Sequence, residues 1–213
     1  MMPPELRLDV LPDIQQKLFA RLQEQTQFLQ ELGFYLAGGT GLALQIGHRR
    51  SVDFDYFSQQ PATTQRILDW LPCFQKFLIR EMDPLTLHAE VDGVKMSFIG
   101  NYRYPLVAEP IFLQKLPGAG VMDIGLMKLL AITHRAALRD YLDLAVILRD
   151  RIPLSSLLEM SRQKYGPHFN IMICLKALTS FGDVEEAEMP ILLDKQLGAS
   201  WREILTQAVK KAV

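Results

Sequence analysis

Residues 35–58 combine glycines, a basic corner and two aspartates, and these residue types suit chemistry on phosphate groups. Gly38-Gly39-Thr40 follows an apolar stretch. Glycine lets the backbone turn sharply and come close to a ligand. Backbone amides at such a turn, just before a helix, favour anions. The sequence therefore predicts a turn that binds phosphate.

Asp53 and Asp55 lie in an alternating stretch, 51–57, in which Phe54 and Tyr56 point to the opposite side. On a strand, two such carboxylates lie roughly 6–7 Å apart along the chain and repel each other unless a cation lies between them. Mg²⁺ is the expected cation because it prefers carboxylate and phosphate oxygens. A phosphate-accepting turn beside a metal-binding Asp-x-Asp is the minimum apparatus for transferring a nucleotidyl group.

A second charged group follows later in the chain. Lys128 lies away from the apolar side of its predicted helix, where a lysine is usually exposed to solvent. Asp140 and Asp143 follow at i,i+3 and share a helix face. Their charges repel unless Arg135, Arg139, Lys128 or a metal offsets them. The simpler alternative is a weak, exposed ion pair between Arg139 and Asp143.

The elements that must position these residues predict an α/β fold: a small twisted mixed sheet covered by helices, with a C-terminal helical lobe. We expect an α/β lobe over residues 1–122 and a helical lobe over 123–213 that completes a cleft. The expected strands are 34–37, 52–57, 77–82, 85–91 and 94–99. Residues 101–120 read as an irregular connector with one short strand at 111–113.

Helix start and stop signals flank the site segments. A long helix is predicted over 11–32 and ends at Gly33. Thr40 is expected to cap the short apolar helix after the glycine turn, and Asp123 to cap a helix over 124–135. Further helices are expected over 154–165, 170–181 and 200–212.

A hairpin over 85–99 is the clearest local signal in the chain. Asp92-Gly93 is the preferred two-residue type I′ turn, and the segments beside it alternate. Folding about this turn creates one wholly apolar face. The other face is polar and carries His88, Glu90, Lys95 and Ser97. The pattern leaves two possibilities open for this polar face, a solvated surface or a wall of the site.

The first site segment resembles the first motif of the AbiEii/AbiGii toxin family of minimal nucleotidyltransferases, within the DNA polymerase beta-like superfamily. The matching residues are Gly38-Gly39-Thr40, Gly47-His48-Arg49, Ser51, Asp53 and Asp55. Residues 127–148, a lysine helix followed by Arg-Asp-x-x-Asp-Leu, resemble the second motif of the same family. The resemblance covers about residues 30–150.

The resemblance implies a role for each matching residue. The nucleotide-binding residues would be Gly38, Gly39, Thr40, Arg49 and Ser51. Asp53 and Asp55 would hold Mg²⁺ and act in catalysis with Lys128 and Asp143. Lys128 would stabilise charge on the phosphates, and Asp143 would orient or deprotonate the acceptor.

This sequence departs from the family pattern at one place. Related nucleotidyltransferases take a third carboxylate from a neighbouring strand, and the resemblance aligns Ser97 with that place. The metal would then have two aspartates, or Glu90 would supply the third carboxylate. The alternative for Glu90 is a cross-strand ion pair with Lys95.

The resemblance implies the toxin of a type IV toxin–antitoxin or abortive-infection system, which transfers a nucleotide from an NTP to RNA, above all tRNA. A cognate antitoxin protein is a possible partner. The alternatives are a nucleotide-binding or antitoxin-binding module without catalysis, or a transferase acting on a protein or small molecule. With 23 basic and 24 acidic residues, the chain has no broad RNA-binding charge.

The bulk composition indicates the compartment. The N-terminus lacks the apolar core of a signal peptide, and no run of about 18 apolar residues occurs, so we expect a cytoplasmic protein without a membrane partner. The 2 cysteines are far apart and fit no zinc or disulfide pattern.

Overall fold

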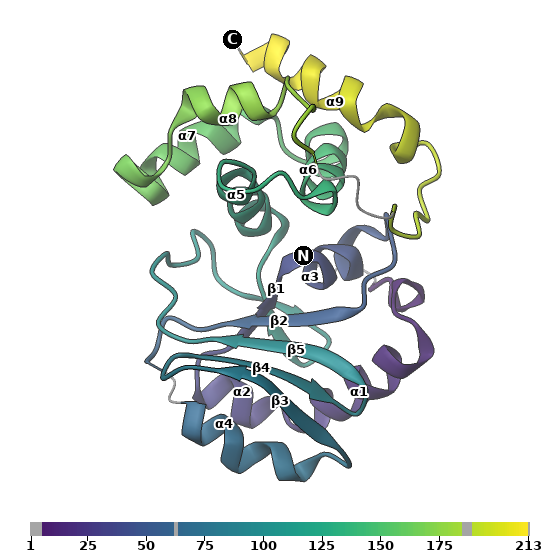
Figure 1. Cartoon of the computed structure of the whole chain (residues 1–213), viewed down its shortest axis with the longest axis vertical. Coiled ribbons are helices and arrows are strands. Elements are labelled where there is room, and N and C mark those ends of the chain that lie inside the picture. Colours follow the sequence, from purple (N-terminus) through teal and green to yellow (C-terminus); the bar gives the residue numbers. More distant parts are fainter. Residues whose placement is uncertain (1–5, 62–63, 185–188, 213) are drawn as a thin grey trace. The chain divides into compact units, whose positions relative to one another are not determined.

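The computed structural model describes residues 6–61, 64–184 and 189–212. The chain forms two compact units, Met1–Ala119 and Gly120–Val213, which we call the sheet unit and the helical unit (Figure 1). The roles expected for lobes 1–122 and 123–213 stay a prediction.

A mixed sheet is the framework of the sheet unit, as predicted. Within the described residues it has 7 strands in the order β3-β4-β5-β2-β1-β7-β6. The strands β2 and β5 are parallel, as are β1 and β7, and the other neighbours are antiparallel. The strands are β1 Tyr35–Ala37, β2 Asp53–Phe57, β3 Phe77–Met82, β4 Thr86–Val91, β5 Val94–Ile99, β6 Ile111–Leu113 and β7 Leu116–Gly118.

The short strand predicted at 111–113 is confirmed as β6, but the prediction of an irregular connector over 101–120 missed β7, which forms a hairpin with β6. In β7, Gly118 pairs with Leu36 of β1 and so extends the sheet. A Cβ atom at Gly118 would lie 2.7 Å from the Leu113 side chain, so the close approach needs glycine. Strands of three residues are too short to show an alternating pattern in sequence.

The β4–β5 hairpin is confirmed in register and turn. Asp92 and Gly93 both have positive φ, 47° and 81°, as a type I′ turn requires. Val91 pairs with Val94, and the pairing continues as expected. The apolar face is buried and consists of Leu87, Ala89, Val91, Val94, Met96 and Phe98.

Three helices cover this apolar face: α1 Asp13–Glu24, α2 Thr26–Glu31 and α4 Thr64–Trp70 (Figure 1). Aromatic side chains fill the space between them and the sheet. The Trp70 ring centroid lies 4.7 Å from that of Phe28 and 5.9 Å from that of Phe98. The predicted single helix over 11–32 is interrupted at Gln25, whose side chain accepts a hydrogen bond from the Trp70 indole.

The remaining helix of the sheet unit, α3 Gly38–Ile46, starts directly at the glycine turn and packs against β1 and β2. The predicted cap was wrong: Thr40 lies inside the helix, and Ala37 at the N-cap makes no side-chain bond. Short 3₁₀ helices complete the description, η1 Leu8–Val10, η2 Leu71–Cys73 and, in the helical unit, η3 Gly166–His168.

The helical unit is built around one buried helix. Its helices are α5 Val121–Ile132, α6 Leu138–Asp150, α7 Leu154–Tyr165, α8 Ile171–Ala177 and α9 Leu197–Ala212. α6 packs against α5 and α9, and Tyr141 of α6 contacts the rings of Phe181 and Trp201. α8 ends earlier and α9 begins earlier than predicted. No helix in the described ranges is both long and apolar enough to cross a bilayer.

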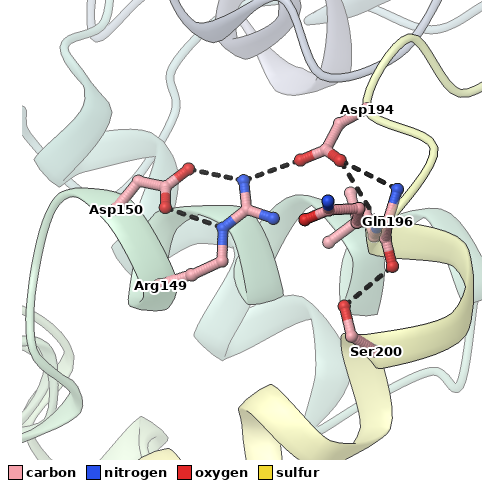
Figure 2. Close-up of polar contacts among 6 residues, drawn as sticks. Arg149, Asp150, Asp194, Gln196 and Ser200 are labelled. Atoms are coloured by element: carbon pink, nitrogen blue, oxygen red, sulfur yellow. Dashed lines mark hydrogen bonds and ion pairs between the residues drawn. The ribbon is translucent and has the colours of Figure 1, made fainter.

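A charged cluster links the end of α6 to the start of α9 (Figure 2). The Arg149 guanidinium donates to Asp150 and, at 2.7 Å, to Asp194. Asp194 also accepts the backbone N–H groups of Gln196 and Leu197. Partial burial acts to raise the Asp194 pKa, but its contacts with Arg149 and these N–H groups prevail and hold the pKa below its usual value.

Candidate functional site

The glycine turn of the sheet unit leaves room for two charged side chains. Gly38 has φ +63°, and a Cβ atom there would lie 2.7 Å from Asp55 Oδ2. A Cβ atom on Gly39 would overlap Arg49 Nη2. The two glycines are therefore required because the Asp55 carboxylate and the Arg49 guanidinium pack directly against the turn.

Buried polar groups support this turn from behind. The Thr40 hydroxyl contacts Ser51 Oγ at 2.7 Å and donates to the Asp53 carbonyl. Arg49 Nη1 donates to the Arg50 carbonyl at 3.0 Å. Thr40 and Arg49 are only 2% and 3% exposed. These contacts connect the start of α3 to the start of β2, which explains why Thr40 does not cap the helix.

Asp53 and Asp55 face one cavity. Both are half-buried on the polar side of β2, while the alternating residues Phe54 and Tyr56 are fully buried on the other side. The cavity has a volume of about 570 Å³. Its lining consists of Asp53, Asp55, Arg80, His88, Ala89, Lys95, Met96 and Ser97. The arrangement presents two carboxylates to a space large enough for phosphate groups.

This cavity decides the alternatives that the hairpin left open. His88, Lys95 and Ser97 line it, so this part of the polar face is a wall of the same cavity as the aspartates. Glu90 is not among the lining residues. Its carboxylate pairs with Arg80 at 2.5 Å. Glu90 lies opposite Lys95 in the sheet, but the ion pair seen is with Arg80 of β3 instead of the Lys95 partner considered from the sequence.

The donor set of this cavity fits a magnesium ion. Mg²⁺ in phosphate-processing enzymes usually takes one or two carboxylates and completes its shell with water and phosphate oxygens. Asp53 and Asp55 supply two carboxylates that are not fully buried. Among the described residues, no cluster of three or more His, Cys, Asp or Glu side chains could hold a metal alone, so phosphate oxygens would have to contribute.

Lys128 and Asp143 come together in the helical unit. Lys128 Nζ lies 2.6 Å from Asp143 Oδ2 and 2.6 Å from Asp140 Oδ1. The expectation of an exposed lysine was wrong: the Lys128 side chain is 9% exposed, and Asp143 is fully buried. Repulsion between the two carboxylates is offset by the ammonium group that they share.

Arg135, in the turn between α5 and α6, completes this ionic cluster. Its Nε donates to Asp140 Oδ2 at 2.8 Å, although its side chain is 66% exposed. Lys128 and Arg135 together balance the charges of Asp140 and Asp143. The weak Arg139–Asp143 pair considered from the sequence is therefore not needed to explain why these aspartates are tolerated.

Asp123 was wrongly predicted as a helix cap. Gly120 precedes the first residue of α5, and Asp123 lies buried in the first turn. Its Oδ1 accepts a hydrogen bond from Lys164 Nζ at 2.7 Å, and both side chains are almost fully buried. The pair joins α5 to α7 and belongs to the core of the helical unit.

Residues 22–212 match a family described as "Nucleotidyl transferase AbiEii toxin, Type IV TA system". The chain belongs to the AbiEii nucleotidyltransferase toxin family. The uncharacterized protein aq_aa25 of Aquifex aeolicus is 36% identical over 166 residues, which cover 72% of this chain and 76% of the relative. The resemblance inferred from the two motifs is thus confirmed.

Solved structures share the fold expected for an AbiEii chain. MenT4, a nucleotidyltransferase toxin from Mycobacterium tuberculosis, superposes with a TM-score of 0.61 at 15% identity, covering 91% of this chain and 82% of MenT4. A protein from H. pylori whose structure is described as that of a nucleotidyltransferase gives 0.54 at 16% identity, covering 92% and 96%. At such identity these likenesses support the α/β nucleotidyltransferase fold.

Sequence reasoning on the AbiEii motifs missed one charged residue of the cavity and left a second one among several alternatives. Arg80 lines the cavity of the aspartates because the β3–β4 register shifts between Ile79 and Glu81, and no sequence signal marked this bulge. Arg135 joins the Lys128 cluster from a turn, and the sequence offered it only as one of several possible counter-charges.

Proposed function

We propose that this chain is a metal-dependent toxin that transfers a nucleotide from an NTP to an RNA acceptor, above all tRNA, in the cytoplasm. The observation that carries the proposal is the pair Asp53 and Asp55, which face one cavity next to the Gly38-Gly39 turn. Membership of the AbiEii family supports toxin nucleotidyl transfer. A cognate antitoxin protein would be its binding partner.

In this proposal the sheet unit binds the triphosphate. The backbone N–H groups of Gly38 and Gly39 would donate hydrogen bonds to phosphate oxygens. The buried Arg49 guanidinium would add positive charge directly behind the turn, while Thr40 and Ser51 keep it in place. Asp53 and Asp55 would hold Mg²⁺, which when bound offsets the negative charge of the phosphates.

Lys128 and Asp143 are the proposed contribution of the helical unit. Lys128 would stabilise negative charge that develops on the phosphates. Asp143 is fully buried and ion-paired with Lys128 at 2.6 Å. The resemblance implies that Asp143 orients or deprotonates the acceptor. Because its carboxylate is held by Lys128, we propose instead that Asp143 positions the lysine.

The direct test is label transfer. Purified wild type would be incubated with each of the four α-labelled NTPs, Mg²⁺ and total RNA, beside Asp53→Asn and the control Asp69→Asn. Asp69 is exposed on α4. We expect one or more NTPs to label RNA with wild type and with the control, and Asp53→Asn to abolish the labelling.

Other outcomes point to the alternative functions. Label recovered in protein or in a small molecule would replace the RNA acceptor, and NTP binding without any transfer would support a non-catalytic module. Thermal melting with and without Mg²⁺ gives a readout independent of activity. Mg²⁺ should raise the melting temperature of wild type more than that of Asp53→Asn, and equal shifts would remove the metal from the proposal.

A further inference from the structure

A row of three polar residues crosses the cavity wall of the sheet unit. Asp55 of β2 is paired with Ser97 of β5, and Ser97 is paired with His88 of β4. His88 Nδ1 lies 3.1 Å from Ser97 Oγ, within hydrogen-bonding distance. All three side chains line the same cavity of about 570 Å³. Aspartate, serine and histidine thus occupy consecutive positions across three strands.

Transfer to a hydroxyl acceptor needs a group that takes the hydroxyl proton. Of the residues that line this cavity, Asp53 and Asp55 are assigned to the metal. Arg80 and Lys95 are ordinarily protonated, and Ala89 and Met96 do not titrate. Asp143 is fully buried in its ion pair with Lys128. This elimination leaves His88, with Ser97 as its hydrogen-bonded neighbour.

We propose that Ser97 and His88 form the proton relay for the acceptor, an inference that rests on the proposed function. The acceptor hydroxyl oxygen bonds to the α-phosphorus of the NTP, the bond from that phosphorus to the bridging oxygen breaks, and pyrophosphate leaves. The acceptor proton passes to Ser97 Oγ while the Ser97 proton passes to His88 Nδ1. The resulting imidazolium then releases this proton to water. Ser97 is the catalytic residue, and His88 acts through it.

Charged groups of both signs surround His88. Arg80 and Glu81 face it from β3, where Glu81 is its direct partner in the sheet. Lys95 lies on β5, Asp53 and Asp55 lie on β2, and Glu90 on β4 is paired with Arg80. Because these groups also titrate or carry charge, the relay has to be tested by comparing the pH profiles of variants.

His88→Asn is the decisive variant. The asparagine side chain can keep a hydrogen bond to Ser97 near the place of Nδ1, but it does not take up a proton at neutral pH. We expect kcat to fall about 100-fold while KM for the NTP changes less than about 2-fold. A relay through His88 also predicts that the pH profile of kcat differs between wild type and this variant.

Ser97→Ala removes the link and leaves the histidine. It should lower kcat to a similar extent, and the double variant should be no slower than the slower single variant, because both residues serve one path. His168→Asn, a replacement of an exposed histidine in the helical unit, is the matched control and should behave as wild type. Circular dichroism of each variant checks that it is folded.

The outcomes separate this inference from the proposed function. An active wild type whose His88→Asn and Ser97→Ala variants keep kcat and the pH profile would overturn the relay alone. If the fold-losses of kcat in the two single variants multiplied in the double variant, the two residues would act independently, and this result would also overturn the relay. A wild type that transfers nothing from any NTP would overturn the proposed function and the relay with it.

Discussion

Each of the two units holds a pair of aspartates, and the surroundings of the two pairs differ. Asp53 and Asp55 are half-buried and face a cavity. Asp140 and Asp143 are buried, and both contact the Lys128 ammonium at 2.6 Å. In the helical unit the two carboxylates share one buried ammonium group, whereas the sheet unit presents its two carboxylates to a cavity whose lining also includes Arg80 and Lys95.

The difference shows that burial decides whether an aspartate pairs with a cation of the protein or is available to a ligand. A buried carboxylate without a counter-charge costs several kcal/mol, so the pair on α6 must be matched within the protein. A carboxylate beside a water-filled cavity pays a smaller desolvation cost and can keep its charge for a ligand. We expect changes in the sheet pair to alter mainly activity, and changes around the helical pair to alter stability as well as activity.

The largest expected effect tests this division directly. Asp55→Asn should lower nucleotide transfer by about 1,000-fold or more, because it removes a metal ligand and the charge it carries. The free energy of unfolding should change by less than about 1 kcal/mol, because the side chain is only half-buried. Transfer assays and urea unfolding measure the two quantities. If the unfolding free energy fell enough to account for the loss of transfer, the contrast between the two aspartate pairs would not hold.

Lys128→Met should give a large loss of stability. Methionine has a similar length but leaves Asp140 and Asp143 buried without the ammonium, which should cost about 3–5 kcal/mol of unfolding free energy. Lys176→Met on α8, where the lysine is exposed, is the control and should change stability by about 0.5 kcal/mol at most. Urea unfolding of both variants checks the prediction, and equal stabilities would show that the Lys128 cluster is not a structural ion pair.

Gly39→Ala should destabilise the sheet unit by about 1–3 kcal/mol. The added Cβ would overlap Arg49 Nη2, so the guanidinium must leave its place behind the turn. Gly182→Ala is the control because a Cβ there meets nothing within 4 Å. Thermal melting measures both. If Gly39→Ala changed the melting temperature no more than Gly182→Ala does, Arg49 would be able to move away without a loss of stability.

The smallest expected effect concerns the more exposed ion pair of Asp194 and Arg149. Asp194→Asn should cost about 0.5–1 kcal/mol at neutral pH. Because the folded-state pKa of Asp194 lies below its usual value, its contribution is fully present above about pH 4. It is lost as the pH falls through the lowered pKa. The stability gap between wild type and variant should therefore narrow as the pH is lowered below the usual aspartate pKa of about 4, and a constant gap would contradict the assignment.

Local signals in the sequence predicted much of the fold. The alternation of 85–99 about Asp92-Gly93 predicted the hairpin and its register, because a type I′ turn permits one pairing. Gly33 predicted a helix end, and its φ of +64° agrees. The segments that failed were short or depended on remote partners: β7 pairs with β1 from far along the chain, and Asp123 pairs with Lys164 instead of capping its helix.

The candidate site shows the same division. The glycine turn and the Asp-x-Asp strand were predicted as neighbours because they are close in sequence. His88 and Arg80 line the cavity because the strand order places β5, β4 and β3 in succession beside β2. The sequence did not decide whether the polar face of the hairpin contacts solvent or the site. Alternation shows which residues share a face, but it does not show what lies beside that face.

The sequence by itself determined the family and the mixed α/β fold, because motif spacing and hydrophobic period are properties of short segments. Only the tertiary structure decided that Lys128 is buried between two carboxylates and that Arg49 packs behind Gly39. Burial and ion pairing depend on which distant elements pack together, and no local pattern contains that information.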